Sequence, residues 1–323
     1  MIRLTLKLTL FGALLAGIQL AYAHKTGYKD APSTVREFDL HMTNSVDIVY
    51  FGDSTLYRGR PEETHAPTTP QLLGNLLPEK TIGSVVHDAY DPRLIAAFCD
   101  HLIRQPHRPE AIIVPINLRA FSPERSRRPE YQFVREILHL RYDSKLFWAF
   151  YRPLAAFGLF NLEPITQEDY FATEVYDADS RIGTFEELYA RQTEAFDRDM
   201  VRALYYYPLD DTHEQLSALK HIAHLCTREG IRPVFYLTPL DYERGNAQLG
   251  AEFEQRTAET AQTIANALSA RGVEVLDLNH KLSSERFVPV SHPDTYLDQE
   301  GKRYVAAELA RFIAQEVTEE TTH

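Results

Sequence analysis

The sequence predicts an α/β fold: a doubly wound sheet of five parallel strands with a mostly helical, aromatic-rich insertion. Two observations lead to this prediction. Short apolar runs alternate with amphipathic stretches on both sides of an irregular middle, and this alternation is typical of parallel sheets covered by helices on both faces. The 323 residues, of which 44% are hydrophobic, suffice for one large domain that carries an inserted segment.

Five short runs rich in Val, Ile, Phe and Tyr predict buried parallel strands. They are Val46–Phe51, Thr81–Val86, Ala111–Ile116, Pro233–Leu237 and Val273–Leu278. The amphipathic stretches that alternate with these runs predict helices. They lie near Gln71–Leu77, Pro92–Ile103, Glu214–Arg228, Phe253–Ala270 and Gly301–Glu316. Doubly wound sheets bind ligands at the carboxyl ends of their strands, so a functional site is expected in the loops at that edge.

The middle of the chain, from about residue 127 to residue 211, has no clear strand and is dense in aromatic residues. We expect it to form a mostly helical insertion beside the sheet. Its aromatic side chains are expected to fill the insertion's own small core. The alternative is that some of them line a groove for a sugar chain or an acyl group, and Trp148 and Tyr151 are the candidate substrate-binding residues there.

The amino terminus has the pattern of a signal peptide. Arg3 and Lys7 precede an apolar stretch, and Ala21-Tyr22-Ala23 supplies the small-x-small pattern that a signal peptidase reads. An uncleaved membrane anchor is the alternative, because Leu4–Ala23 reaches the minimum of about 17 residues that cross a bilayer. Both alternatives place residues 24–323, a single α/β domain with the insertion, outside the cytoplasm, either free or tethered to a membrane by the amino-terminal segment.

Composition excludes several classes of protein. The net charge of −12 comes without a basic stripe, so we expect no nucleic-acid partner. The sequence has no glycine-rich phosphate loop, no dinucleotide fingerprint and no His and Cys cluster with metal-ligand spacing, so we expect neither a cofactor nor a metal. The two cysteines, Cys99 and Cys226, are expected to be separate buried thiols rather than a disulfide.

Polar residues follow each of the first three predicted strands. Ser54 ends a Gly-Asp-Ser turn after the first strand, His87 and Ala89 follow the second, and Asn117 follows the third. Acyl transfer needs a nucleophilic oxygen, a base, and hydrogen-bond donors for the oxyanion of the tetrahedral intermediate. We therefore predict that Ser54 is a nucleophile. The backbone N–H groups of Ser54 and Ala89 and the side-chain amide of Asn117 are the predicted oxyanion donors.

These blocks resemble the SGNH/GDSL hydrolase superfamily over roughly residues 44–120 and 213–316. The resemblance implies a flavodoxin-like fold in which the serine of the Gly-Asp-Ser block is the nucleophile and a glycine N–H and an asparagine amide complete the oxyanion hole. Ser54 and Asn117 match these positions, while Ala89 stands where the family has glycine. An alanine donates the same N–H, provided that the turn does not need a positive φ.

The family's last block is an Asp–His pair that activates the serine, and the segment before the final helix is similar to the form seen in alginate O-acetylation proteins. Asp294 matches the aspartate, but Tyr296 falls at the histidine position, and the only histidine in the segment is His292. Either the loop lets His292 reach Ser54, with Asp294 or Asp277 orienting its ring, or the histidine is lost. Imidazole, with a reference pKa of about 6.5, is a better base near neutrality than a phenol at about 10, so we predict a base role for His292.

The sequence therefore predicts an exported serine esterase or O-acyltransferase that acts on an acyl ester of an extracytoplasmic carbohydrate or lipid. His87 and Tyr296, near the same edge of the sheet, are additional candidates for substrate contact. The alternative function is a catalytically silent glycan-binding or complex-forming subunit of an envelope polysaccharide-modification system. The tyrosine at the expected histidine position motivates this alternative.

Overall fold

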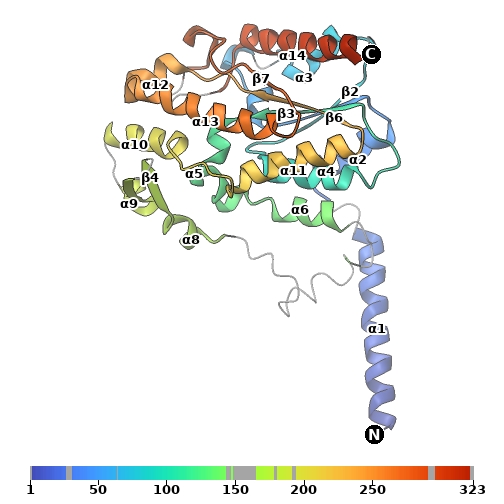
Figure 1. Ribbon diagram of the computed structural model, residues 1–323. Coiled ribbons are helices and arrows are strands. Elements are labelled where there is room, and N and C mark those ends of the chain that lie inside the picture. The colour runs from blue at the N-terminus through green and yellow to red at the C-terminus, as the bar shows by residue number, and fades with distance from the viewer. Residues whose placement is uncertain are drawn as a thin grey trace.

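The computed structural model describes residues 2–26, 31–63, 65–142, 147, 165–177, 180–190, 194–289 and 295–320. The centre of the described chain is a five-stranded, all-parallel sheet with the strand order β2-β1-β3-β6-β7, covered by helices on both faces (Figure 1). Counted within this sheet, the order is 2-1-3-4-5, one of the two common orders of doubly wound sheets. The predicted α/β class and the parallel sheet are confirmed.

Each of the five predicted strands is present in this sheet. The strands are β1 (Ile48–Gly52), β2 (Ile82–Val86), β3 (Ala111–Ile116), β6 (Arg232–Leu237) and β7 (Val275–Asp277). Every residue of β1 and of β3 is buried. Strands that are buried on both faces have continuous apolar sequences rather than alternating ones, which is why these runs were recognisable.

The helices divide between the two faces of the sheet. One face is covered by α2 (Ser33–Thr43), α4 (Pro92–Leu102), α11 (Glu214–Arg228) and α13 (Glu252–Ser269), and the other by α3 (Thr69–Leu76) and α14 (Gln299–Glu320) (Figure 1). Successive side chains of β1 alternate between the two cores, with Val49 and Phe51 in the first and Ile48 and Tyr50 in the second. The sheet is therefore buried from both sides and positions its loops rigidly.

The segment between β3 and β6 contains the predicted insertion. Between β3 and α11, the described helices and strands are α5 (Pro123–Ser126), α6 (Val134–Arg141), α8 (Gln167–Phe171), β4 (Glu174–Asp177), β5 (Ser180–Thr184), α9 (Phe185–Ala190) and α10 (Glu194–Tyr205). Here β4 and β5 form an antiparallel hairpin, so the prediction of no strand in this segment was wrong. The hairpin is short and largely exposed, with Val175 and Gly183 as its buried residues. Its sequence therefore lacks the apolar run that marks the central strands.

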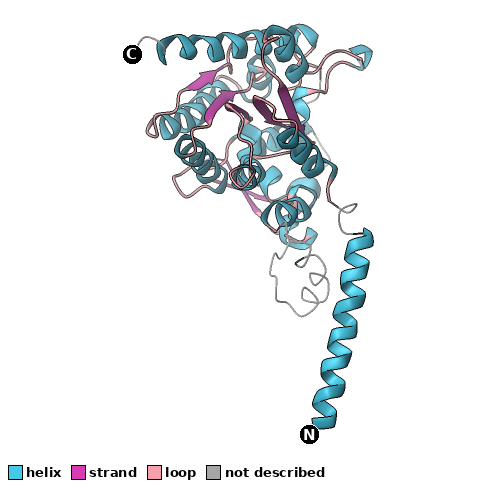
Figure 2. Cartoon of the chain, turned by 90° about the vertical axis from the view of Figure 1, so that its right-hand side faces the viewer, coloured by secondary structure: helices cyan, strands magenta, loops and turns pink. Residues whose placement is uncertain are grey.

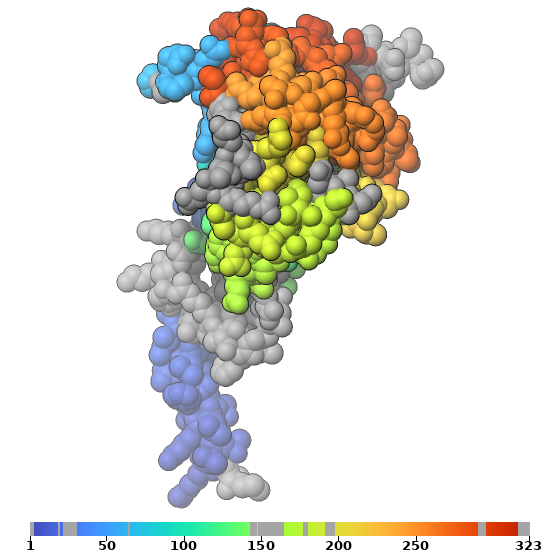
Figure 3. Space-filling model, turned by 90° about the vertical axis from the view of Figure 1, so that its left-hand side faces the viewer, coloured from blue at the N-terminus to red at the C-terminus, as the bar shows by residue number. Residues whose placement is uncertain are grey.

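Aromatic residues of the insertion pack in two places. Tyr170 and Phe185 belong to a small separate core, whereas Tyr205, Tyr206 and Tyr207 join the main core. Figure 3 shows the insertion in yellow-green beside the orange surface of α12 (Tyr242–Leu249) and α13. The two candidate substrate-binding residues of this segment, Trp148 and Tyr151, lie outside the described residues.

The amino-terminal helix α1 (Ile2–Thr26) extends away from the α/β core (Figures 1 and 2). Its apolar side chains are exposed, with Leu4 at 64% and Leu8 at 62% of full exposure. Among the described residues, none of the helices combines the length and the apolar character that a membrane span requires.

Cys99 and Cys226 are both buried and form no disulfide in the structure. They lie on α4 and α11, which pack side by side. The prediction of two buried thiols rather than a disulfide is confirmed. Hydrogen bonding with Cys226, together with burial, raises the pKa of the Cys99 thiol. The closeness of the two thiols depends on how the two helices pack, which the sequence does not show.

Candidate active site

Polar residues gather at the carboxyl ends of β1, β2 and β3 around one small cavity of about 20 Å³. The strand β1 pairs in parallel with both β2 and β3, so the loops that follow the three strands leave the sheet at the same edge. The structure thus brings together Ser54, Ala89 and Asn117, which the sequence placed in three separate loops. The lining residues are Asp53, Ser54, Ala89, Tyr90, Asp91, Asn117, Arg119, Ala120 and Arg125.

Ser54 begins the 3-10 turn η1 (Ser54–Leu56) directly after β1. The carboxylate of Asp53 caps this turn by accepting a hydrogen bond from the backbone N–H of Thr55 at 2.8 Å. The turn folds back closely on the strand, since a Cβ on Gly52 would lie 2.2 Å from Cδ1 of Leu56. Glycine at the strand end and aspartate at the cap therefore hold the Ser54 hydroxyl at the edge of the sheet, where the residue is 5% exposed.

Ala89 has a φ of +62°, in the left-handed region that favours glycine. The turn after β2 therefore does need a positive φ, and the condition under which alanine would replace glycine without cost is not met. Ala89 lines the cavity beside Ser54. An alanine at this position costs stability, because the left-handed conformation costs an L-residue about 1–2 kcal/mol.

We expect Ala89→Gly to raise the free energy of unfolding by about 0.5–1 kcal/mol. The relief of the left-handed strain exceeds the extra backbone entropy that glycine brings to the unfolded chain. Urea unfolding of both proteins measures the difference. Ala97→Gly, on the helix α4, is the matched control and should lower the stability by about 1 kcal/mol. If Ala89→Gly lost as much stability as this control, the inference that the backbone of Ala89 is strained would be wrong.

Asn117 is buried and makes three hydrogen bonds. Its Oδ1 accepts from the backbone N–H of Arg119 at 3.3 Å and caps the turn η3 (Leu118–Phe121). Its Nδ2 donates to Oδ2 of Asp53 at 3.2 Å and to Oγ1 of Thr295 at 3.3 Å. The capping role and the position beside Ser54 are thus both present. A substrate oxyanion would have to replace one of the two acceptors of the amide.

Tyr296 contacts the candidate nucleophile directly. Its hydroxyl lies 3.0 Å from Oγ of Ser54, and either oxygen can donate the hydrogen bond. Two guanidinium groups lie close to the phenol ring, that of Arg119 at 5.0 Å and that of Arg58 at 5.8 Å from the ring centroid. The residue at the expected histidine position therefore occupies the position of a base on the serine.

Arg58 is held by an ion pair with Asp88, 2.6 Å long, and the hydroxyl of Tyr57 donates to the same carboxylate. Burial lowers the pKa of Arg58, but Tyr296 and Asp88 outweigh this effect and raise it above the ordinary value. Burial and the hydrogen bond to Asp88 raise the pKa of Tyr57 to about 12. At neutral pH this group therefore consists of a guanidinium cation beside Tyr296 and a protonated phenol on Asp88.

Two other candidates, His87 and Asp277, are not part of this arrangement. His87 is exposed, stacks on Tyr90 with ring centroids 5.2 Å apart, and lies at 3.1 Å from the carbonyl oxygen of Asp88 through Nδ1. It packs in the turn and does not line the cavity beside Ser54. Asp277, at the end of β7, accepts from the backbone N–H of Asn279 at 2.9 Å. His292 and Asp294 lie outside the described residues.

Three residues of the site were missed by the sequence analysis: Arg58, Arg119 and Thr295. Arg119 and Arg58 follow the predicted Asn117 and Ser54 by two and four residues. A search for cations in the loops that carry the predicted residues would have found both. Thr295 precedes Tyr296 directly, and nothing in the sequence indicates that its hydroxyl meets Asn117.

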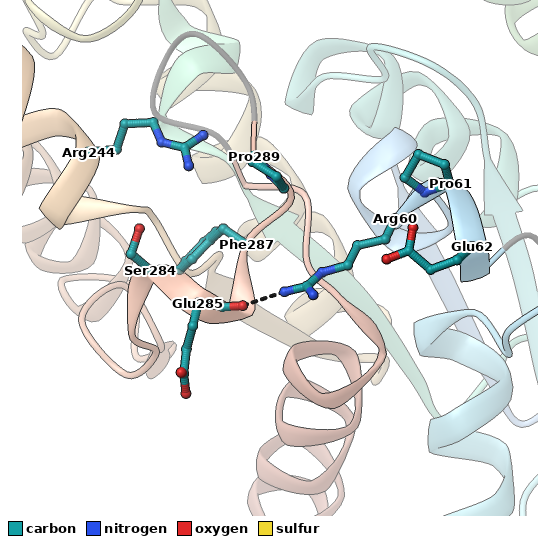
Figure 4. A pocket seen from close by; sticks show the side chains of 8 residues that line it. All are labelled: Arg60, Pro61, Glu62, Arg244, Ser284, Glu285, Phe287 and Pro289. Carbon is teal, nitrogen blue, oxygen red and sulfur yellow. Dashed lines mark hydrogen bonds between the residues drawn. The ribbon is translucent and has the colours of Figure 1, made fainter.

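A second and larger cavity, of about 440 Å³, lies between the segment after η1 and the loop before α14. In Figure 4, Arg60 and Arg244 approach it from opposite sides. Arg60 donates to the carbonyl oxygen of Glu285 at 2.6 Å, and Ser284 donates to the carboxylate of Asp241 at 2.9 Å. The lining residues are Arg60, Pro61, Glu62, Arg244, Ser284, Glu285, Phe287 and Pro289.

The sequence matches no protein-family model and no curated protein. The fold and the site define an α/β protein with a polar site at the carboxyl ends of its parallel strands, which is where such sheets bind their ligands. The chemistry of Ser54 and its neighbours must therefore indicate the function.

Proposed function

We propose that the protein is a serine-dependent acyl-transfer enzyme, an esterase or an O-acyltransferase, acting on an acyl ester of an extracytoplasmic carbohydrate or lipid. One observation carries the proposal: Ser54, Ala89 and Asn117 come from three different loops and line one cavity. A hydroxyl, a backbone N–H and an amide at one point are the groups that acyl transfer requires. The apolar amino-terminal segment supports the location outside the cytoplasm.

In the proposed reaction, Oγ of Ser54 attacks the acyl carbon and the carbonyl oxygen becomes negatively charged. The backbone N–H groups of Ser54 and Ala89 and the amide of Asn117 stabilise this oxyanion. The alcohol then leaves, and water or an acceptor hydroxyl releases the acyl group from Ser54. The Asn117 amide takes part by exchanging its bond to Asp53 or Thr295 for a bond to the substrate oxygen.

The two cavities differ in size, and the difference suits an oxyanion site in the small cavity and an acyl or acceptor site in the large one. The cavity of about 20 Å³ beside Ser54 has room for about one water-sized group, which suits a single oxygen such as the oxyanion. The acyl chain and the acceptor need more space, and the larger cavity offers it. The segment before α14 contributes to both places. Phe287 lines the larger cavity and pairs with Leu297, the neighbour of Tyr296.

The proposal is tested by rapid mixing of the purified protein with excess p-nitrophenyl acetate. A covalent acyl-enzyme is expected to form, so nitrophenolate should appear in a fast burst of about one equivalent, followed by slower steady release. Acid quenching should recover an acetylated protein by mass spectrometry. Nitrophenolate release without an acetylated intermediate, or no release above the buffer rate, would contradict the proposal.

The second candidate is a catalytically silent protein. It would use the same edge of the sheet to bind a glycan or to form a complex in an envelope polysaccharide-modification system. Two observations favour it: the Tyr296 phenol lies on Ser54, and both N–H groups of Asn117 already have acceptors. This candidate gives neither a burst nor an acetylated protein. The same experiment therefore separates the two functions.

A further inference from the structure

In the described chain, the side-chain hydroxyl of Ser54 is hydrogen-bonded to the phenol of Tyr296. Resting on the acyl-transfer function proposed above, we propose that Tyr296 is itself a catalytic residue, which as a phenolate accepts the proton of Ser54 in the position of the expected histidine. A general base must lie within about 2.6–3.2 Å of the atom whose proton it takes, and tyrosine is among the side chains that serve as one. The 3.0 Å separation from Oη of Tyr296 to Oγ of Ser54 meets that requirement.

The chain on both sides of Tyr296 is fixed, so the phenol is held on the serine. Before it, the hydroxyl of buried Thr295 accepts from the Asn117 amide at 3.3 Å. After it, buried Leu297 pairs with Phe287, and the carbonyl of Tyr296 itself accepts from the backbone N–H of Val288 at 2.9 Å. Tyr296 is therefore anchored to the oxyanion side of the site and to the loop before α14.

Two cations lie against the ring of Tyr296. The guanidiniums of Arg58 and Arg119 approach it from two different loops, at 5.8 Å and 5.0 Å from the ring centroid. The carboxylates of Asp88 and Asp53 have other partners, because Asp88 is paired with Arg58 and Asp53 accepts from Asn117.

The proposed step balances. The proton moves from Oγ of Ser54 to Oη of Tyr296 while Oγ forms a bond to the acyl carbon and the carbonyl π electrons move to oxygen. When the intermediate collapses, the ester C–O bond breaks and the leaving alcohol takes the proton from Tyr296. Water or an acceptor hydroxyl then repeats the cycle, first losing its proton to Tyr296 and finally regenerating the Ser54 hydroxyl.

A phenol accepts a proton only after it has ionised, so the rate of Ser54 acylation should rise steadily with pH. We expect roughly a tenfold rise for each unit between about pH 6 and about pH 8. The rate is measured in single turnovers with p-nitrophenyl acetate and corrected for hydroxide-driven hydrolysis in buffer. Tyr296→Phe should lower it by at least about a hundredfold, the usual contribution of a general base.

Tyr296→His should be faster than the parent near neutrality, with a rate that levels off around pH 6.5, where imidazole loses its proton. His292→Ala removes the other candidate base, so its pH profile, compared with that of the parent, shows which of the two residues takes the proton. Tyr304→Phe, on α14, removes a similarly half-buried phenol away from Ser54 and is the matched control for Tyr296→Phe. Thermal unfolding of each variant shows whether the fold is retained, and the parent's profile remains informative if a variant fails to fold.

Two results would overturn this role for Tyr296. One is loss of acylation in His292→Ala with a parent rate that levels off near pH 6.5, which would make an imidazole the base. The other is a folded Tyr296→Phe protein in which Ser54 is acetylated at the parent rate, which would leave the phenol without a role in proton transfer. Acetylation that persists in Ser54→Ala is a different result, because it would contradict the proposed function itself.

Discussion

Replacing Ser54 by alanine is expected to abolish the acetylated intermediate and to lower the release of nitrophenolate by at least about a thousandfold. In the proposed mechanism the hydroxyl oxygen of Ser54 is the atom that bonds to the acyl carbon. The substitution removes one buried oxygen at the start of η1 and leaves the Asp53 cap in place. Steady-state turnover and mass spectrometry after acid quenching measure the two effects.

Thr55→Val is the matched control for this substitution. Thr55 is the next residue of the same turn, its side chain is equally buried, and its hydroxyl has no hydrogen-bond partner in the described chain. Removing that hydroxyl should therefore change turnover by less than about threefold. If Thr55→Val were as inactive as Ser54→Ala, the loss would reflect a disturbed turn. If Ser54→Ala kept the parent rate, another residue would be the nucleophile.

Replacing Asn117 by alanine is expected to slow turnover by at least about a hundredfold. The loss of one oxyanion donor costs on the order of 2.7–4 kcal/mol in the activation free energy. The effect should fall on the rate of acylation more than on substrate binding, because the donor matters most when the oxygen carries charge. Single-turnover acetylation over a range of p-nitrophenyl acetate concentrations separates the two.

Asn117 also has structural bonds, so its variant needs a comparison. Asn117→Ala loses the cap on η3 and the bonds to Asp53 and Thr295, which lowers stability by about 1–2 kcal/mol. Thr295→Val removes one of the same hydrogen bonds but keeps the amide. It should slow turnover far less than Asn117→Ala, because it keeps the amide and loses only one of the contacts that position Tyr296. An Asn117→Ala rate within about fivefold of the parent would remove the amide from the oxyanion site.

The central sheet was predictable chiefly from its inner strands, because β1 and β3 are buried on both faces and are continuously apolar. The bounds of β3 and α11 agree with the predicted ranges, since β3 is continuously apolar and α11 has a clear amphipathic period. The helices α2 and α12 and the hairpin of β4 and β5 were missed. Their sequences are mixed or polar, and α12 has a glycine in its interior where Phe253 packs against it. Tertiary packing, not local pattern, stabilises these elements.

The candidate site was predictable only where it depends on topology. Parallel strands carry their following loops to one edge, and that rule alone places Ser54, Ala89 and Asn117 together. The left-handed conformation of Ala89 depends on the local path of the turn, which no residue nearby reveals. The contact of Tyr296 with Ser54 joins positions 242 residues apart and depends on the conformation of the loop before α14.

Covalent labelling with a fluorophosphonate probe, followed by peptide mapping, tests most directly whether Ser54 is a reactive nucleophile. We expect a single adduct, located on Ser54, that forms faster as the pH rises from about 6 to about 8 and is absent from the Ser54→Ala protein. A parent protein that stays unlabelled across that range, or an adduct that maps to a different residue, would contradict the proposed role of Ser54 as the nucleophile.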